Sequence, residues 1–184
     1  MNSQAHRIRD ELPAIFLFIG SIWVVFLLDI LLPLESFGLV PRTLFGLAGI
    51  VTMPFLHSSL AHLLSNTAPL LVLLSLLAGS MASSRTIVAV IIVQGGALLW
   101  LMGRGETNHI GASGLVFGLA VFLIVSGFLE RRVIPLAISI AVIFMYGSSL
   151  ISGIMPWQPG TSWDGHLFGG IAGAITAWWL VKRR

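Results

Sequence analysis

The chain has no cysteine and few charged residues for its length. Only 9% of its 184 residues are Asp, Glu, Lys or Arg, whereas a soluble domain carries about a quarter. The lack of cysteine excludes disulfides, thiolate metal sites and cysteine nucleophiles. The net formal charge of +3 comes from residues in short loops and tails. Charge placed there sets membrane topology and does not indicate nucleic-acid binding, and no metal or other cofactor is expected.

Apolar residues take the place of the missing charge. They make up 57% of the sequence, and the mean hydropathy is +0.98. This composition predicts an all-α, polytopic membrane protein, with residues 1–184 forming a single membrane domain. The first apolar run is too long for a signal peptide and has no small-residue cleavage site after it, so it reads as a retained helix. Six segments are long enough to span a bilayer: 13–34, 59–79, 85–102, 112–129, 133–152 and 165–181.

The positive charges predict how these segments are oriented. Two basic residues, Arg42 and Arg104, fall on one side of the membrane. The other eight fall on the side shared by both termini: Arg7, Arg9, Arg85, Arg131, Arg132, Lys182, Arg183 and Arg184. Because cytoplasmic loops carry the excess of Lys and Arg, both termini are expected in the cytoplasm. The longest connection, 35–58, is too apolar for a solvated loop and is expected to lie partly in the membrane interface.

Candidate catalytic residues stand at the start of three of the spans. Asn66 and His62 open the second span, Ser113 the fourth and His166 the sixth. The predicted topology brings all three spans in from the outer side, so these residues converge at one depth. A serine hydroxyl needs a base to become a nucleophile, and histidine is suited to that task. Ser113 alone could be a packing residue and His166 alone could bind a carbonyl, but at matched depth the two favour a catalytic pair.

A Ser–His pair also requires two helices to approach closely. Small residues at spacings of three and four let membrane helices pack backbone to backbone. They recur in both segments: Gly111, Gly114 and Gly118 in one, and Gly165, Gly169, Gly170, Gly173 and Ala177 in the other. His166, Gly170, Gly173 and Ala177 are expected to share one helix face. Phe117 lies one turn beyond Ser113 and is expected to pack against the imidazole.

Donors for an oxyanion are a second requirement of acyl transfer. His62 and Asn66 are four residues apart and share a helix face, so they could donate together with the backbone N–H of Ser113. The alternative for them is a packing hydrogen bond between helices. His57 lies too far around a helix from His62 for a shared metal site and is expected to order the loop.

The remaining polar residues of the outer side have simpler interpretations. Asp164 is expected to cap the last span, with Ser162 as the alternative cap. His109 is expected to be a loop residue, and Asp29 is given no role. The nucleophile elbow of soluble α/β-hydrolases needs glycine two residues after the serine, where this chain has Leu115, so that fold is excluded.

The stretches HSSLAHLLSN, GASG and GHLFGGIAG lie in this order on the second, fourth and sixth spans. Together they resemble the rhomboid family of intramembrane serine proteases, in its bacterial six-helix core form, over nearly the whole chain. The resemblance implies a dyad with Ser113 as nucleophile and His166 as base, and His62 and Asn66 as oxyanion donors. It also implies a bacterial cell-membrane location, a cavity open to the outer side, and single-span protein substrates that enter laterally from the bilayer.

The sequence departs from the family pattern at two places. Many members have Trp-Arg in the first loop, where this chain has Pro41-Arg42. Many also have tyrosine at the position of Phe117; phenylalanine keeps the stacking surface and loses only a hydroxyl.

Two other functions compete with an intramembrane endopeptidase that cuts near the outer face. A catalytically silent relative that binds transmembrane helices would need neither Ser113 nor His166. A small transporter could use His57, His62, His166 and Asn66 as a polar path. That path should continue toward the cytoplasm, but the inner halves of these spans offer only scattered serines and a threonine.

Overall fold

The computed structural model describes residues 8–80, 84–157 and 160–182, and over these ranges the chain contains helices and no β-strand. Arg7, Arg183 and Arg184, which contributed to the topology prediction, lie outside the described residues. The α-helices are α1 (Ile8–Asp29), α2 (Gly46–Thr52), α3 (Leu60–Ser80), α4 (Ser84–Met102), α5 (Ser113–Glu130), α6 (Val133–Gly153) and α7 (Trp163–Lys182). Two 3₁₀ helices, η1 (Leu34–Phe37) and η2 (Met53–Phe55), flank α2.

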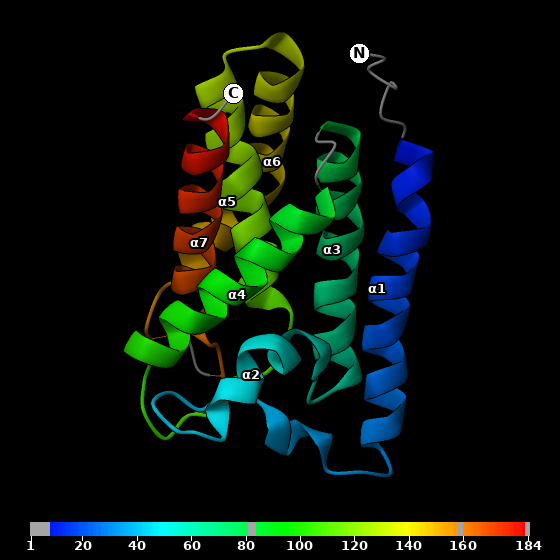
Figure 1. Ribbon diagram of the computed structural model, residues 1–184, viewed down its shortest axis with the longest axis vertical. Coiled ribbons are helices and arrows are strands. Elements are labelled where there is room, and N and C mark those ends of the chain that lie inside the picture. Colours follow the sequence, from blue (N-terminus) through cyan, green and yellow to red (C-terminus); the bar gives the residue numbers. More distant parts are fainter. Residues whose placement is uncertain (1–7, 81–83, 158–159, 183–184) are drawn as a thin grey trace.

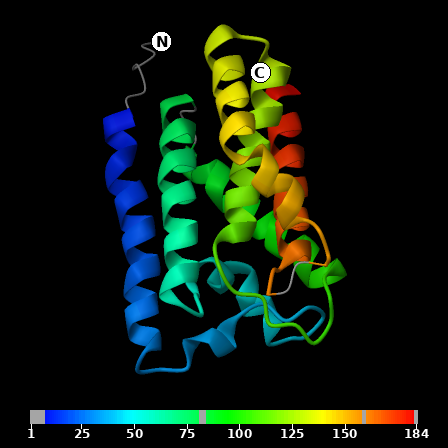
Figure 2. The same cartoon turned by 180° about the vertical axis from the view of Figure 1, so that it is seen from behind.

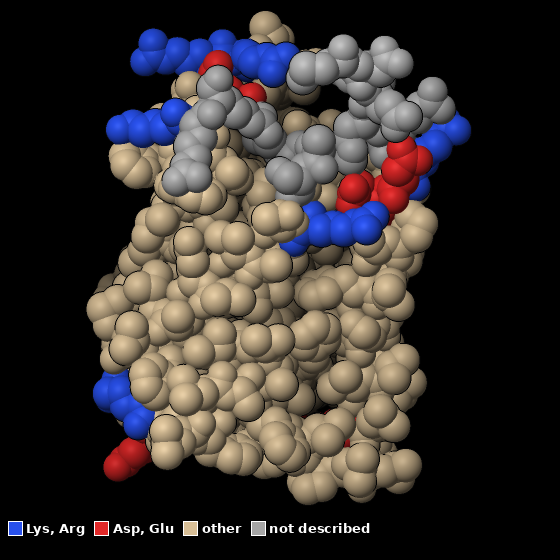
Figure 3. All heavy atoms as spheres, viewed as in Figure 1, with Lys and Arg blue, Asp and Glu red and all other residues tan. Residues whose placement is uncertain are grey.

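The six long helices correspond to the six apolar segments expected from the sequence, and five of them are apolar enough to cross a membrane. The sixth, α7, is as long but less apolar, because its first turns carry Asp164, His166 and several glycines. It packs against α5 and α4 within the bundle. The prediction of an all-α polytopic membrane protein is confirmed, and Figure 3 shows a broad belt without charged side chains between two charged ends.

The expected boundaries of the first span, 13–34, were wrong by five residues at each end. The helix α1 begins at Ile8, because the charged residues before the apolar run are also helical. It ends at Asp29, whose Oδ1 accepts a hydrogen bond from the Glu35 backbone N–H at 3.0 Å. That bond closes a turn that contains Pro33, and helical backbone is disfavoured for the residue before a proline.

The helices α3, α5 and α7 all begin at the end of the molecule that holds α2, while α1 begins and α7 ends at the opposite end (Figure 1). The reverse view in Figure 2 shows α1 at the edge, beside α3. The most buried of the long helices is α5, which makes its most extensive contact with α7. The starts of three helices are therefore gathered around α5, as the candidate site requires.

Glycine permits the contact between α5 and α7. A side chain on Gly169 or Gly173 would collide with the carbonyl oxygen of Gly114 or Gly118, respectively. Gly170 was expected on this face, but a Cβ placed there would lie 3.5 Å from a Val121 methyl carbon, at ordinary contact distance. On α7 a Cβ would therefore meet the α5 backbone at Gly169 and Gly173, four residues apart, and on α5 a Cβ at Gly118 would lie 2.9 Å from the Gly169 carbonyl oxygen.

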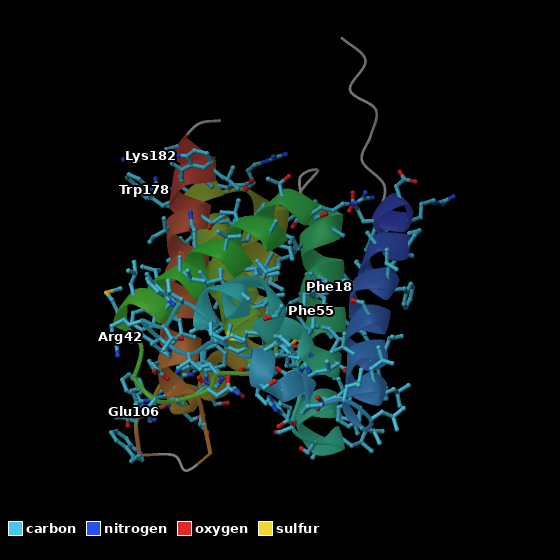
Figure 4. All side chains as sticks on the ribbon, turned by 60° about the horizontal axis from the view of Figure 1, so that its bottom comes forward. Phe18, Arg42, Phe55, Glu106, Trp178 and Lys182 are labelled. Atoms are coloured by element: carbon cyan, nitrogen blue, oxygen red, sulfur yellow. The ribbon has the colours of Figure 1, made fainter. Side chains whose placement is uncertain are left out.

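The first loop is fastened to the end of α4 by Arg42, without the help of tryptophan at position 41. The Arg42 guanidinium donates to the carbonyl of Gly103 at 2.7 Å and to that of Leu101 at 3.3 Å. The last carbonyls of a helix lack partners within it, and a cation is favoured there. Figure 4 shows Arg42 at the end of the molecule opposite Lys182.

The same loop presents an apolar surface. Its exposed large side chains are Phe37, Leu44, Phe45, Leu47 and Val51. Phe55 packs edge-on against Phe18 of α1 at 5.5 Å between ring centroids (Figure 4). These side chains suit a segment at the membrane interface, as the sequence predicted.

Candidate active site

Ser113 is the first residue of α5 and follows a tight turn at Gly111 and Ala112. Gly111 has a φ of +109°, which side chains rarely tolerate, and a Cβ there would lie 2.5 Å from His62 Nε2. The Gly111 N–H donates to the carbonyl of Met53 at 3.0 Å. The first loop thus holds the turn in place. At the start of a helix the Ser113 N–H has no acceptor within α5, so it can serve an incoming oxyanion.

The imidazole of His166 bridges Ser113 and the end of α6. Its Nε2 lies 2.8 Å from Ser113 Oγ, and its Nδ1 lies 2.8 Å from the carbonyl oxygen of Gly153. A carbonyl can only accept, so Nδ1 carries the proton in the neutral ring. Nε2 is then free to accept the Ser113 hydroxyl proton, which is the tautomer a general base needs.

Phe117 and Gly153 fix the orientation of that ring. Phe117 stacks on His166 with 4.1 Å between ring centroids and 10° between the ring planes. A Cβ on Gly153 would collide with the Phe117 ring and lie 3.1 Å from His166 Nδ1. Sequence analysis missed Gly153, because a glycine at the end of an apolar helix reads as an ordinary helix terminator. The effect of Gly153 on the His166 ring depends on where the end of α6 packs against α7.

His62 and Asn66 lie across the cavity from this pair, on the first turns of α3. The His62 Nε2 faces the turn at Gly111, and its Nδ1 lies 3.4 Å from Ser58 Oγ. The buried Asn66 amide donates to the His62 carbonyl at 2.8 Å. That bond lies within α3, so it is not the interhelical packing bond considered from the sequence. A side-chain amide has a second N–H to offer a ligand.

His57 is buried beneath this region and contacts the turn before Ser113. Its Nε2 lies 3.5 Å from the Ala112 backbone N–H, and its ring packs edge-on against His62 at 4.9 Å. Burial, and to a smaller extent the neighbouring His62, lower the pKa of His57 to about 4. The ring is therefore neutral at pH 7 and able to accept the Ala112 N–H.

A cavity of about 670 Å³ joins these residues. Its volume is that of many water molecules, each of which takes about 30 Å³ in the liquid, and falls in the range of ligand pockets. The polar wall comes from α3, the loops before α5 and α7 and the starts of those two helices, and the apolar wall comes from α5 and α6. Its lining includes Ser58, His62, Asn66, Ser113, Val116, Phe117, Met145, Tyr146, Leu150 and His166.

The expectation that Asp164 caps α7 was wrong. Asp164 lies inside the first turn, and its carboxylate accepts hydrogen bonds from Arg104 instead: 2.9 Å from the backbone N–H and 3.1 Å from Nη2. The alternative cap, Ser162, immediately precedes the helix and accepts the His166 N–H at its carbonyl, at 3.0 Å. The Asp164 carboxylate bonds the guanidinium in preference to the helix N–H groups, because a charged donor makes the stronger hydrogen bond.

Comparisons with known proteins identify the family of the chain. The Rhomboid domain matches residues 45–183. The uncharacterized protein Rv1337 of Mycobacterium tuberculosis (strain ATCC 25618 / H37Rv) is 41% identical over 180 residues, covering 90% of this chain and 73% of that protein. The uncharacterized protein ML1171 of Mycobacterium leprae is 41% identical over 141 residues, covering 72% of this chain and 55% of that protein. With the match to the Rhomboid domain extending over most of its length, the chain belongs to the rhomboid family.

Proposed function

We propose that the protein is an intramembrane serine endopeptidase, built as one membrane domain over residues 1–184. The observation that carries the proposal is the Ser113–His166 hydrogen bond, with the imidazole proton directed to the far nitrogen by Gly153. A protein that only binds transmembrane helices needs neither an imidazole with an unprotonated Nε2 nor a serine hydroxyl hydrogen-bonded to that nitrogen.

The geometry supports a two-step reaction. Ser113 Oγ attacks the carbonyl carbon of the scissile peptide as its proton passes to His166 Nε2. The resulting oxyanion is stabilised by the Ser113 N–H, Asn66 and His62. His166 then gives the proton to the leaving amine, and the C–N bond breaks to leave an acyl-enzyme. A water deprotonated by His166 attacks the ester, and Ser113 recovers the proton as the acid product leaves.

The protonated His166 is stabilised by a backbone carbonyl in this scheme. Its Nδ1–H donates to Gly153 at 2.8 Å, and the stacked Phe117 covers one face of the ring. The carboxylate of Asp164 is occupied by Arg104. A dyad is therefore sufficient.

Single-span membrane proteins are the proposed substrates. The cavity is lined by α3 and α6, which have only slight contact with each other, so a substrate segment could reach it from the bilayer between them. A peptide bond must leave its helical hydrogen bonding to reach Ser113, which favours substrates with Gly or Pro near the cut. Both termini are proposed to lie in the cytoplasm of a bacterial cell, with the cavity open to the outer side.

The cut is expected in the outer part of the substrate helix or in the adjoining outer segment. Ser113 is the first residue of α5, and α5 begins in the half of the molecule away from the start of α1 (Figure 1), so the nucleophile is proposed to lie toward the outer side. The test incubates purified protein in detergent with a labelled single-span substrate and locates the cut bond by mass spectrometry of both fragments. Ser113→Ala is the control.

A cut near the cytoplasmic end of the substrate would contradict this placement. Reporter fusions at Arg85 and Arg131 would then show whether the topology or the site assignment is at fault. Both residues are expected on the cytoplasmic side.

Gly153→Ala is expected to lower kcat/KM by about 10- to 100-fold, because misplacement of a catalytic group by about an ångström has an effect of that size. The added methyl would collide with Phe117 and crowd His166. Alanine favours helix over glycine by about 1 kcal/mol, so thermal unfolding should not reveal a loss of stability large enough to explain the rate. Ser152→Ala, at the exposed neighbouring position, is the matched control. Equal rates for the two variants would mean that Gly153 does not orient the base.

A further inference from the structure

A second polar cluster lies beside the reacting pair and joins the two segments that deliver it. It consists of His109, Ser162, Asp164 and Arg104. His109 stands four residues before Ser113 in the chain, and Ser162 stands four before His166. None of the four is needed to abstract or donate a proton in the proposed reaction.

His109 is the centre of this cluster. Its side chain is 1% exposed, and its Nδ1 lies 2.6 Å from Ser162 Oγ. Its Nε2 lies 3.7 Å from the Asp164 carboxylate. A carboxylate facing Nε2 favours the proton on that nitrogen, so Nδ1 accepts the Ser162 hydroxyl proton. Burial lowers the pKa of His109 against the opposing effect of Asp164, which keeps the ring neutral at neutral pH.

The backbone of His109 is held as firmly as its ring. Its N–H donates to the Leu39 carbonyl at 2.8 Å, and its carbonyl accepts the Leu39 N–H at 2.9 Å. The segment before Ser113 is thus pinned to the first loop on one side. Its imidazole reaches the start of α7 on the other.

Ser162 connects the His109 ring to the backbone of His166. Its hydroxyl bonds His109, while its carbonyl accepts the His166 N–H at 3.0 Å. A displacement of Ser162 therefore displaces the first turn of α7, which carries His166. Asp164 holds the same turn from its other side, through two hydrogen bonds from Arg104 just beyond α4.

We propose that His109 and Asp164 are positioning residues that set the separation of Ser113 and His166, acting through Ser162 and the first turn of α7. The inference rests on the proposed protease function. Neither residue touches the reacting atoms. The hydrogen bond with Ser162 fixes the direction as well as the distance of the link, while Nε2, at 3.7 Å from the Asp164 carboxylate, is beyond hydrogen-bond distance and interacts with it only electrostatically.

Two substitutions at position 109 distinguish the contact made by Nδ1 from the contact made by Nε2. In His109→Asn the side-chain oxygen takes the place of Nδ1 and can accept the Ser162 hydroxyl. In His109→Gln the amide extends to the place of Nε2 and leaves that hydroxyl without its acceptor. The assay uses the full-length protein with a labelled single-span substrate and measures kcat, KM and thermal unfolding.

The expected result is a loss confined to kcat. His109→Gln and Ser162→Ala should each lower kcat by about 10- to 100-fold with KM within about twofold, since a misplaced catalytic group slows the chemical step. Because they break the same bond, the double variant should be little slower than either single variant. His109→Asn should keep most of the wild-type kcat. Asp164→Asn, which weakens the hold of Arg104 on the same turn, should also lower kcat at unchanged KM.

The matched control is Ser139→Ala, which removes a buried hydroxyl bonded to Leu123 and Ile124 away from the site. Wild-type kcat in both His109→Gln and Ser162→Ala would overturn the inference. So would equal losses in His109→Asn and His109→Gln that follow the loss of thermal stability, since that pattern means a purely structural role. Failure of the protease function itself looks different: wild-type protein would then neither cleave substrate nor be labelled at Ser113 by a serine-reactive phosphonate.

Discussion

Replacing Ser113 or His166 with alanine is expected to lower the cleavage rate by about 10⁴-fold or more, with the fold intact. The two residues form one hydrogen-bonded unit at 2.8 Å, and each is useless to the reaction without the other. Residues that act as a unit are strongly non-additive in their effects on rate. The double variant should therefore be little slower than either single variant.

The measurement is the initial rate of fragment release from a labelled transmembrane substrate, together with labelling by a serine-reactive phosphonate. Wild-type protein should be labelled at Ser113, Ser113→Ala not at all, and His166→Ala much more slowly. Ser126→Ala is the matched control, because Ser126 is the other serine on α5 and its buried hydroxyl bonds only a carbonyl of its own helix among the contacts described. Near wild-type turnover in Ser113→Ala would end the protease assignment for this site.

The match between expected and observed helices follows from the strength of the apolar signal. Runs of about 20 apolar residues have few alternatives to a membrane helix, so five of the six segments were correct to within a few residues. The first segment was misplaced because hydropathy does not indicate that the charged residues before the apolar run are helical, and because the apolar run continues beyond Asp29, where the helix ends. The last segment had the weakest apolar signal, since α7 is the helix that combines polar residues of the site with the glycines that pack on α5.

Ser113 and His166 could be paired from the sequence because both begin spans that enter from the same side. Charge counts and span order are sufficient to pair the two residues, and no contact between helices needs to be known. Gly153 and His109 could not be found in this way. Their contribution depends on where the end of α6 and the loop before α5 meet α7, and such meetings between distant segments leave no local pattern.

The structure also shows that the carboxylate nearest to His166 in sequence does not orient its ring. Asp164 is two residues from His166, which invites a triad. Its carboxylate is instead held by Arg104, and the base is oriented by the Gly153 carbonyl. In the proposed reaction an uncharged acceptor is sufficient, because Phe117 and the close α5–α7 contact already restrict the ring. Helix packing therefore does part of what a third catalytic residue would do.

Removing the oxyanion donors is expected to have the next largest effect on rate. Loss of one such donor typically lowers kcat by about 10²–10³-fold, so Asn66→Ala and His62→Ala should each fall in that range. Both side chains line the cavity that holds Ser113, with the His62 ring over the turn at Gly111. Because the Ser113–His166 bond does not involve them, phosphonate labelling of Ser113 should persist in both variants.

Asn66→Asp separates an oxyanion donor from a packing residue. Aspartate has nearly the same shape but replaces the donor with a negative charge that repels the oxyanion, so this variant should be at least as slow as Asn66→Ala. A packing role would predict that aspartate is tolerated better than alanine, with the loss of rate tracking the loss of thermal stability. Thr67→Val is the matched control, since Thr67 lies next to Asn66 on α3 and bonds Trp23 of α1. A normal cleavage rate in the combined His62→Ala, Asn66→Ala variant would contradict the assignment of these residues as oxyanion donors. The backbone N–H of Ser113 would then stabilise the oxyanion without the two side chains.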